Sequence, residues 1–146
     1  MSMQSVGKVI KLFISKQGSS LREEKDNYAL DTHGILKDKY YNTNPQRSVL
    51  ISSLTSYTLA STKGIDLNFG LLGENILLDY NPYKLPAGTQ LFIGSTVLEI
   101  SQNCTICNHL SQIDERLPTL LEHDRGIFVK VIKKGCIKKG DIVYLR

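Results

Sequence analysis

Two cysteines, Cys104 and Cys107, stand where a predicted β-strand gives way to a segment with helical spacing. In that strand Leu98 and Ile100 share one face by the two-residue period of extended chains. A thiol at a strand end is held by a rigid scaffold and reached by water, and its thiolate is both a nucleophile and a soft metal ligand. The two sulfurs are therefore candidate reactive groups. The alternative is that both are small buried hydrophobic residues.

The spacing of these cysteines fits two other kinds of site. A CxxC pair that opens a helix can form a reversible disulfide, although no thioredoxin-like βαβ pattern precedes this one. A zinc site would need two further ligands, and the chain offers His109, His123 and Cys136. The second half of the chain lacks the CxxC or HxxxH spacing that common zinc sites show. The cysteine count of three is odd, so we expect thiols in a reducing cytoplasm rather than a disulfide framework.

A polar segment upstream gathers ionisable side chains around one glycine. Its candidates are Asp31, His33, Asp38 and Lys39, with Gly34 between them. The glycine predicts a turn, from which neighbouring side chains could project into a shared space. Asp31 and His33 would share a face of an extended chain. Such a pair is more often a surface contact than a catalytic dyad.

Further polar residues border short apolar strands. Arg47 precedes one such strand, Glu74 and Asn75 precede another, and Arg125 lies in a charged turn. A carboxylate and an amide at the start of a buried strand can fix backbone or ligand hydrogen bonds, or they can simply cap the turn.

Short strands and glycine-rich turns must position these groups. Residues Gly7–Ser15 alternate as a strand, which we predict turns Ile10, Leu12 and Ile14 towards the core. The charged stretch Leu21–Asn27 is predicted to be a solvated connector.

Helices and a hairpin complete the predicted elements. Ser52 or Ser53 is placed to cap a helix that ends near Lys63 and Gly64. Leu110, Ile113 and Leu117 follow the spacing of a short amphipathic helix, and residues 127–145 are predicted to form a final hairpin. Many short strands with few helices favour a β-barrel or sandwich with helical inserts, built as a single domain over residues 1–146.

The totals agree with an ordinary globular domain. The chain has 146 residues, 41% hydrophobic and 22% charged, with a formal net charge of +4. Lysines near the C-terminus alternate with apolar residues, which is typical of the wet face of strands, so we expect no nucleic-acid partner. The N-terminus lacks the apolar core of a signal peptide and no apolar run is long enough for a membrane span, so we expect a cytoplasmic protein.

Several short motifs, in this order and spacing, resemble the MOSC domain, the module at the C-terminus of molybdenum cofactor sulfurases that also occurs as a stand-alone bacterial protein. The motifs that carry the resemblance are His33-Gly34-Ile35-Leu36-Lys37-Asp38, Arg47, Phe69-Gly70-x-x-Gly73-Glu74-Asn75, Gly88 to Ile100, Cys107 with Leu110, Arg125-Gly126-Ile127-Phe128 and Lys139-Gly140-Asp141-Ile142-Val143. The sequence departs from the family pattern where Cys104 and Ile106 stand for an Arg and a Pro, and where Lys37 stands for a Gly.

The resemblance implies a mainly β fold, a closed or partly closed Greek-key-like β-barrel with a few short helices, of the MOSC or pyruvate-kinase type. It implies a groove that binds a molybdenum cofactor (molybdopterin), or a cysteine that carries sulfur as a persulfide. Related proteins ligate molybdenum through this cysteine and reduce N-hydroxylated compounds. The implied partners are the pterin cofactor or a small-molecule substrate, and a cofactor-assembly or reductase protein.

The resemblance also assigns roles to individual residues. It implies Cys107 as the nucleophilic or molybdenum-ligating thiolate. Arg47, Lys39 and Arg125 would hold the pterin phosphate. The remaining candidates would orient the ring or brace the groove; they are His33, Asp38, Glu74 and Asn75. The alternatives to this function are a CxxC thiol redox protein and a non-catalytic interaction module.

Overall fold

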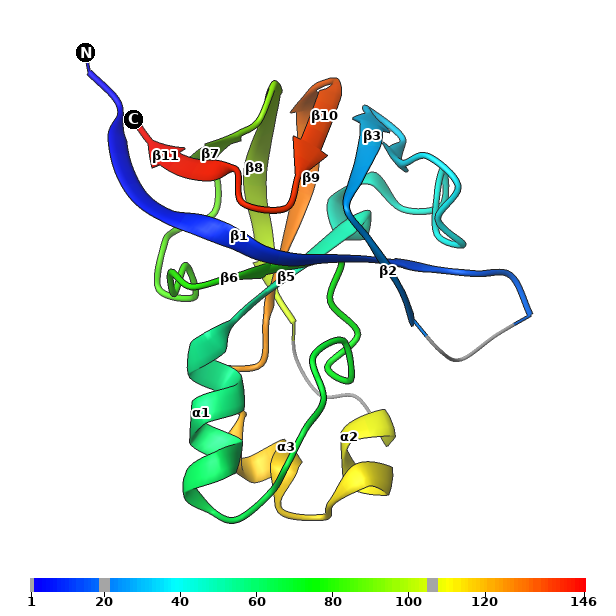
Figure 1. Ribbon diagram of the computed structural model, residues 1–146, viewed down its shortest axis with the longest axis vertical. Helices are drawn as coiled ribbons and strands as arrows, with labels where there is room; N and C mark the ends of the chain where they lie inside the picture. Colours follow the sequence, from blue (N-terminus) through cyan, green and yellow to red (C-terminus); the bar gives the residue numbers. More distant parts are fainter. Residues whose placement is uncertain (1, 19–21, 105–107) are drawn as a thin grey trace.

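A computed structural model describes residues 2–18, 22–104 and 108–146 (Figure 1). The strands are β1 (Gln4–Ser15), β2 (Arg22–Lys25), β3 (Asn27–Asp31), β4 (Gly34–Ile35), β5 (Val49–Ser53), β6 (Ile76–Leu78), β7 (Gln90–Ile93), β8 (Thr96–Asn103), β9 (Ile127–Lys133), β10 (Gly135–Lys138) and β11 (Ile142–Leu145). The helices are the 3-10 turn η1 (Pro45–Arg47), α1 (Leu54–Thr62), α2 (Asn108–Ile113) and α3 (Leu117–Leu120). The fold is therefore mainly β, as predicted.

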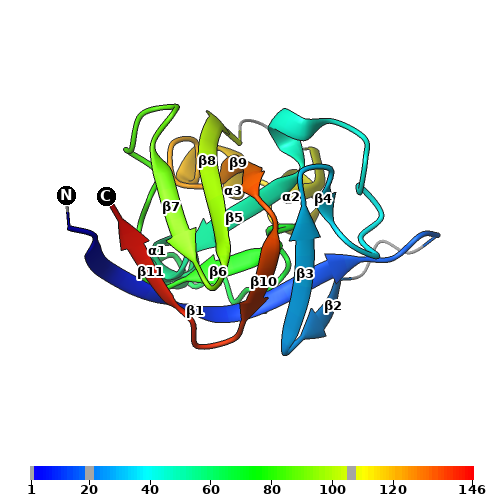
Figure 2. The ribbon, with the colours of Figure 1, turned by 90° about the horizontal axis from the view of Figure 1, so that it is seen from above.

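Within the described residues, seven strands form a closed barrel in the order β1-β11-β7-β8-β9-β5-β6 and back to β1. The closing pair is β1 with β11, and Figure 2 shows β11 between β1 and β7. The C-terminal part of β1 extends past the barrel to pair with β2. A second sheet, in the order β10-β3-β4, lies beside the barrel. The predicted closed barrel is confirmed.

The face of β1 that lines the barrel changes along the strand. Val9 is buried in the barrel core together with Leu12 and Ile14, whereas Ile10 packs against a different cluster. The pairing with β6 shifts its register between Val9 and Lys11. A bulge adds one residue and moves the following side chains to the other face. The prediction of a single inward face including Ile10 is therefore wrong.

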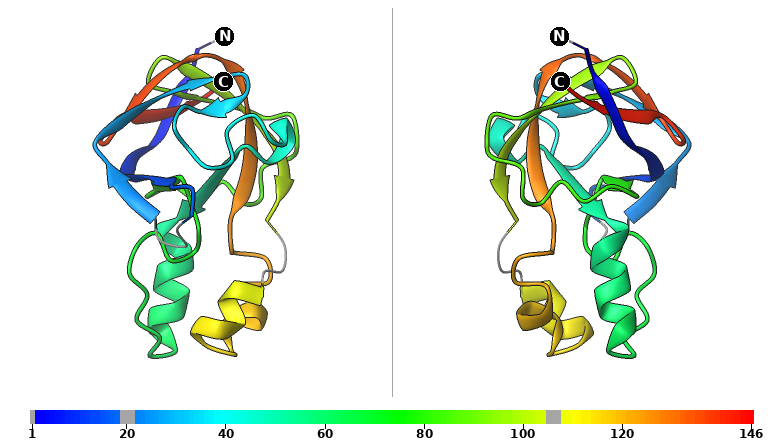
Figure 3. Two further views of the ribbon diagram at one scale, coloured as in Figure 1. Left: turned by 90° about the vertical axis from the view of Figure 1, so that its right-hand side faces the viewer. Right: turned by 90° about the vertical axis from the view of Figure 1, so that its left-hand side faces the viewer.

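The three α-helices gather at one end of the barrel (Figure 3). Ser53 caps α1 by accepting a hydrogen bond from the Thr55 amide, and Gly64 follows with a left-handed φ of 73°. The helices cover an apolar cluster that includes Tyr57, Leu72 and Leu110. The longest helix among the described residues has nine residues, so none of them could cross a bilayer.

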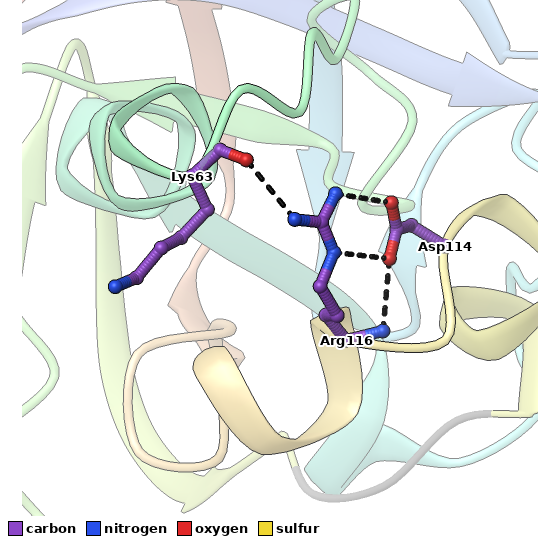
Figure 4. A network of polar contacts seen from close by, with 3 residues as sticks. All are labelled: Lys63, Asp114 and Arg116. Carbon is purple, nitrogen blue, oxygen red and sulfur yellow. Dashed lines mark hydrogen bonds and ion pairs between the residues drawn. The ribbon is translucent and has the colours of Figure 1, made fainter.

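Arg116 joins the end of α1 to the segment between α2 and α3 (Figure 4). Its guanidinium donates to the Lys63 carbonyl at 3.1 Å and to both carboxylate oxygens of Asp114, at 3.0 and 2.8 Å. These hydrogen bonds lower the pKa of Asp114 to about 2.

Two other predictions about elements are corrected. Strands β9 and β11 do not form a hairpin with each other, because β9 pairs with β8 and β5 while β11 pairs with β1 and β7. The intervening β10 leaves the barrel to pair with β3. The segment predicted to be a solvated connector contains a strand, β2, which pairs with the end of β1.

Candidate functional site

A pocket of about 440 Å³ lies between β2, η1 and the ends of β8 and β9. The residues of its wall that matter for chemistry are Arg22, Tyr40, Arg47, Asn75, Cys104, Arg125 and Phe128. They come from six separate stretches of the chain, which the barrel and the loop after β4 bring together. Its volume lies within the usual range for small-molecule sites, about 300–1,000 Å³.

Three arginines give the pocket its positive charge. Arg125 is only 6% exposed, and its Nε has no hydrogen-bond partner among the described residues. Nη1 of Arg22 also has no hydrogen-bond partner among the described residues, and burial is the main cause that lowers the pKa of this arginine. A guanidinium stays protonated in proteins, and a buried donor without a partner is costly. These donors could pair with a negatively charged group, in addition to the buried carboxylates of Asp38 and Glu74, whose charges already act on Arg22.

Cys104 lies at the end of β8 and faces Arg125. The Arg125 Nη1 donates a hydrogen bond to the Cys104 sulfur, and the Cys104 amide donates to the Gly126 carbonyl at 3.0 Å. The Arg125 carbonyl in turn accepts from the hydroxyl of Ser52 at 3.3 Å. A neighbouring guanidinium favours the thiolate, which is the nucleophilic and metal-binding form of cysteine.

Aromatic rings form a second feature of the wall. The guanidinium of Arg47 lies 4.7 Å from the centre of the Phe128 ring, and the ammonium of Lys39 lies 5.4 Å from that of Tyr40. Tyr40 is 45% exposed. Flat rings beside cations suit a ligand that has a planar part and an anionic part.

Asn75 and Asp38 brace the pocket from below. The Asn75 side chain accepts from the Leu50 amide at 3.0 Å and donates to the Phe13 carbonyl at 3.3 Å and to Asp38 at 3.4 Å. Asp38 also accepts from the amides of Ser15, at 2.7 Å, and Tyr40, at 2.9 Å. These two buried side chains tie β1, β5 and the Tyr40 loop into one rigid unit.

Glu74, the residue before Asn75, is fully buried. It accepts a hydrogen bond from the Tyr57 hydroxyl at 2.5 Å, and its other carboxylate oxygen has no partner among the described residues. Burial raises the pKa of Glu74, against the opposing effect of the Tyr57 hydrogen bond. Glu74 is not among the described residues that line the pocket, so its predicted role in the site stays a prediction.

The predicted residues divide into four groups. Arg47, Asn75 and Arg125 line the pocket, while Asp38 and Glu74 are buried and are not among its described lining residues. His33 and Lys39 are absent from its described wall; the His33 ring packs on Tyr41, at the outer side of the same loop. Cys107 lies outside the described residues, so its predicted role stays a prediction.

The sequence did not single out three pocket residues, Arg22, Tyr40 and Phe128, as site residues. It offered Cys104 as a reactive thiol, as half of a CxxC pair or as a zinc ligand, and gave it no part in cofactor binding. Nothing local distinguishes Arg22 from the charged residues around it. Phe128 lies near the start of β9, after Arg125, and the pairing of β9 with β5 and β8 places it at the pocket. The Cys104 position was visible as a departure from the family motif.

The described residues hold no group of three or more His, Cys, Asp or Glu side chains that could bind a metal ion. His123 is highly exposed and contacts Glu122, and Cys136 lies on the second sheet. Among the described residues that line the pocket, Cys104 carries a sulfur atom.

Comparison with known proteins places this fold. Among curated protein sequences, none matches the chain. The YuaD protein of Bacillus subtilis superimposes with a TM-score of 0.84 at 16% identity, over 99% of this chain and 97% of that one. YiiM of Geobacillus stearothermophilus gives 0.71 at 15% identity, over 99% and 75%. YiiM of Escherichia coli gives 0.72 at 15% identity, over 95% and 69%. These likenesses concern the fold.

The MOSC domain model matches residues 38–144, which is more than half of the chain. That span begins at the buried Asp38, includes the Asn75 brace and the cysteine end of β8, and ends in the closing strand β11. The chain therefore belongs to the MOSC domain family, which is associated with molybdenum cofactor binding or sulfuration.

Proposed function

We propose that the pocket binds a molybdopterin-type molybdenum cofactor through its phosphate and its planar ring system. The observation that supports this most is the pair of buried donors on Arg22 and Arg125 that find no partner among the described residues. An anion in the pocket would satisfy both through charge-assisted hydrogen bonds. Arg47 would supply the third cation, because it lines the same pocket.

The residues present fit such a ligand. The phosphate would take the arginines, and the planar ring would lie against Phe128 and Tyr40. Asp38 and Asn75 would keep these contacts in place without touching the ligand's charge. When bound, the cofactor supplies a molybdenum centre that exchanges electrons or sulfur. The sulfur ligand from this chain would be Cys107, as the family resemblance implies.

Sulfur carriage is a second candidate function for the same pocket. It is favoured by the hydrogen bond from Arg125 to the Cys104 sulfur, since this pairing favours a nucleophilic thiolate inside a positively charged cavity. A carrier of this kind would hold sulfur as a persulfide and pass it to a cofactor or a partner protein.

Elemental and pterin analysis of freshly purified protein tests cofactor binding. The protein would be produced in cells that make the cofactor, and its molybdenum and its oxidised, fluorescent pterin would be measured per chain. We expect Arg47→Gln to lower both by about tenfold, the loss expected for one charge-assisted hydrogen bond. Arg146→Gln serves as the matched control, because Arg146 lies over Phe92 away from the pocket. Protein that retains neither molybdenum nor pterin under these conditions would contradict the proposal.

A further inference from the structure

The nucleophilic sulfur of Cys104 lies beside arginines that could bind an anion. It is 8% exposed and lines the pocket, and its sulfur accepts a hydrogen bond from Arg125. Arg125 is itself more than nine-tenths buried, and its Nε donor remains without a partner in the described part of the chain. One guanidinium therefore offers one N–H to the sulfur and a second to something else.

The second N–H needs a hydrogen-bond acceptor, and the surrounding positive charge favours an anionic one. Arg22 adds another buried donor without a described partner, and Arg47 adds a third cation to the same wall. Among the described residues that line the pocket, none has an acidic side chain. A small anion whose oxygens meet these donors would lie beside the Cys104 sulfur, because all four residues border one cavity of about 440 Å³.

We propose that Cys104 accepts a sulfur atom from a small anionic sulfane-sulfur compound, of which thiosulfate is the simplest. The Cys104 thiolate attacks the outer sulfur of thiosulfate and forms a new sulfur–sulfur bond. The original sulfur–sulfur bond breaks, and sulfite leaves with its electron pair while the arginines hold its oxygens. Cys104 is left as a persulfide. The exchange needs no added oxidant, reductant or proton.

This proposal rests on the sulfur-carrier function proposed above and on the same arginine-lined pocket. It assigns the sulfur to Cys104, the residue that stands where the family pattern has an arginine, rather than to Cys107. It also names the substrate class, an anion, because the donors in the wall are positively charged and the leaving group carries negative charge.

The test uses the full-length protein made in cells unable to synthesise the molybdenum cofactor. Purified protein is incubated with thiosulfate, sulfite release is measured, and peptide mass spectrometry locates the added sulfur. We expect one sulfur on Cys104 with an equal amount of sulfite. Cys104→Ser should abolish both, whereas Cys136→Ser, which removes an exposed cysteine on the second sheet, should leave both unchanged. Sulfur found only on Cys107 or Cys136 would overturn the assignment.

A second variant tests the role of charge. Arg22→Gln should slow the reaction with thiosulfate about tenfold, yet leave the alkylation of Cys104 by neutral iodoacetamide within twofold of the wild-type rate. Equal slowing of both reagents would overturn the anion step. The failure of this proposal is separable from that of the proposed function, because cofactor binding is read from molybdenum and pterin in cofactor-producing cells and needs no thiosulfate.

Discussion

At the residue scale, Arg125 links the chemistry of the pocket to the scaffold beneath it. Its side chain donates to Cys104, while its carbonyl accepts from Ser52 at 3.3 Å on the inner end of β5. The Asn75 side chain differs, because it already forms hydrogen bonds with the Leu50 amide and the Phe13 carbonyl. The pocket wall thus contains side chains whose hydrogen bonds are made within the protein and side chains that have donors available for a ligand.

Asn75→Ala would leave the Leu50 amide and the Phe13 carbonyl without their side-chain partner in a buried place. We expect it to lower the free energy of unfolding by about 2–3 kcal/mol, measured by urea titration. Asn68→Ala, at an exposed position, is the control and should change it little. Equal stability of the two variants would show that Asn75 is not a structural brace.

Glu74 should make stability fall as the pH rises above its ordinary pKa of 4.5. Its pKa is raised in the folded protein, so the folded state holds the proton more tightly than the unfolded state does, and ionisation at higher pH costs stability. Glu74→Gln keeps an acceptor for Tyr57 without the charge. We expect the stability of the variant relative to the wild type to increase as the pH rises above 4.5, in urea titrations at each pH. Parallel curves would contradict this.

At the element scale, local signals explain which elements could be predicted. Helix α1 was predictable because Ser53 caps it and Gly64 ends it. The inner face of β1 was not, because a bulge leaves no mark in the hydrophobic pattern. Strand β2 was not predicted, because a charged edge strand has the composition of a loop. Arg22, which lies in β2, was therefore not recognised as a pocket residue. Arg47, Asn75 and Arg125, which line the pocket, could be singled out from the sequence because their motifs are local.

Arg116 fixes the helical end of the molecule, and the pKa of Asp114 reports on it. We expect NMR titration of the Asp114 carboxyl to give a midpoint near 2 in the wild type and one closer to 3.8 in Arg116→Ala. Because this pKa is lowered in the folded state, the stabilisation is present above pH 3.8 and is lost as the pH falls towards 2. Lys63→Ala is the control, because Lys63 contributes only its carbonyl. Unchanged titration in Arg116→Ala would contradict the contact.

At the scale of the whole molecule, the second sheet carries the loop that supplies Tyr40 to the pocket. That sheet is tied to the barrel at the β7–β8 turn, where the Ser95 amide donates to the Cys136 carbonyl at 3.1 Å and the Cys136 amide donates to the Ser95 hydroxyl at 2.8 Å. Gly94 sits at this junction with a left-handed φ of 57°. The sheet that carries the Tyr40 loop thus contacts the barrel through Ser95 and Cys136, which lie 41 residues apart in the sequence.

Substitution of Gly94 tests whether this close approach holds the two sheets together. A Cβ at Gly94 would meet the Cys136 carbonyl and lie 2.8 Å from Asp141, whereas a Cβ at Gly88, which also has a positive φ of 93°, would meet nothing within 4 Å. Gly88→Ala should cost only the backbone strain, about 1–2 kcal/mol. Gly94→Ala should cost about 1–3 kcal/mol more, as overpacking does. Urea titration of both variants measures the difference, and hydrogen exchange should show faster exchange in β10 and β3 of Gly94→Ala alone. Equal costs would mean that the junction is loose and that the second sheet is held by its other contacts.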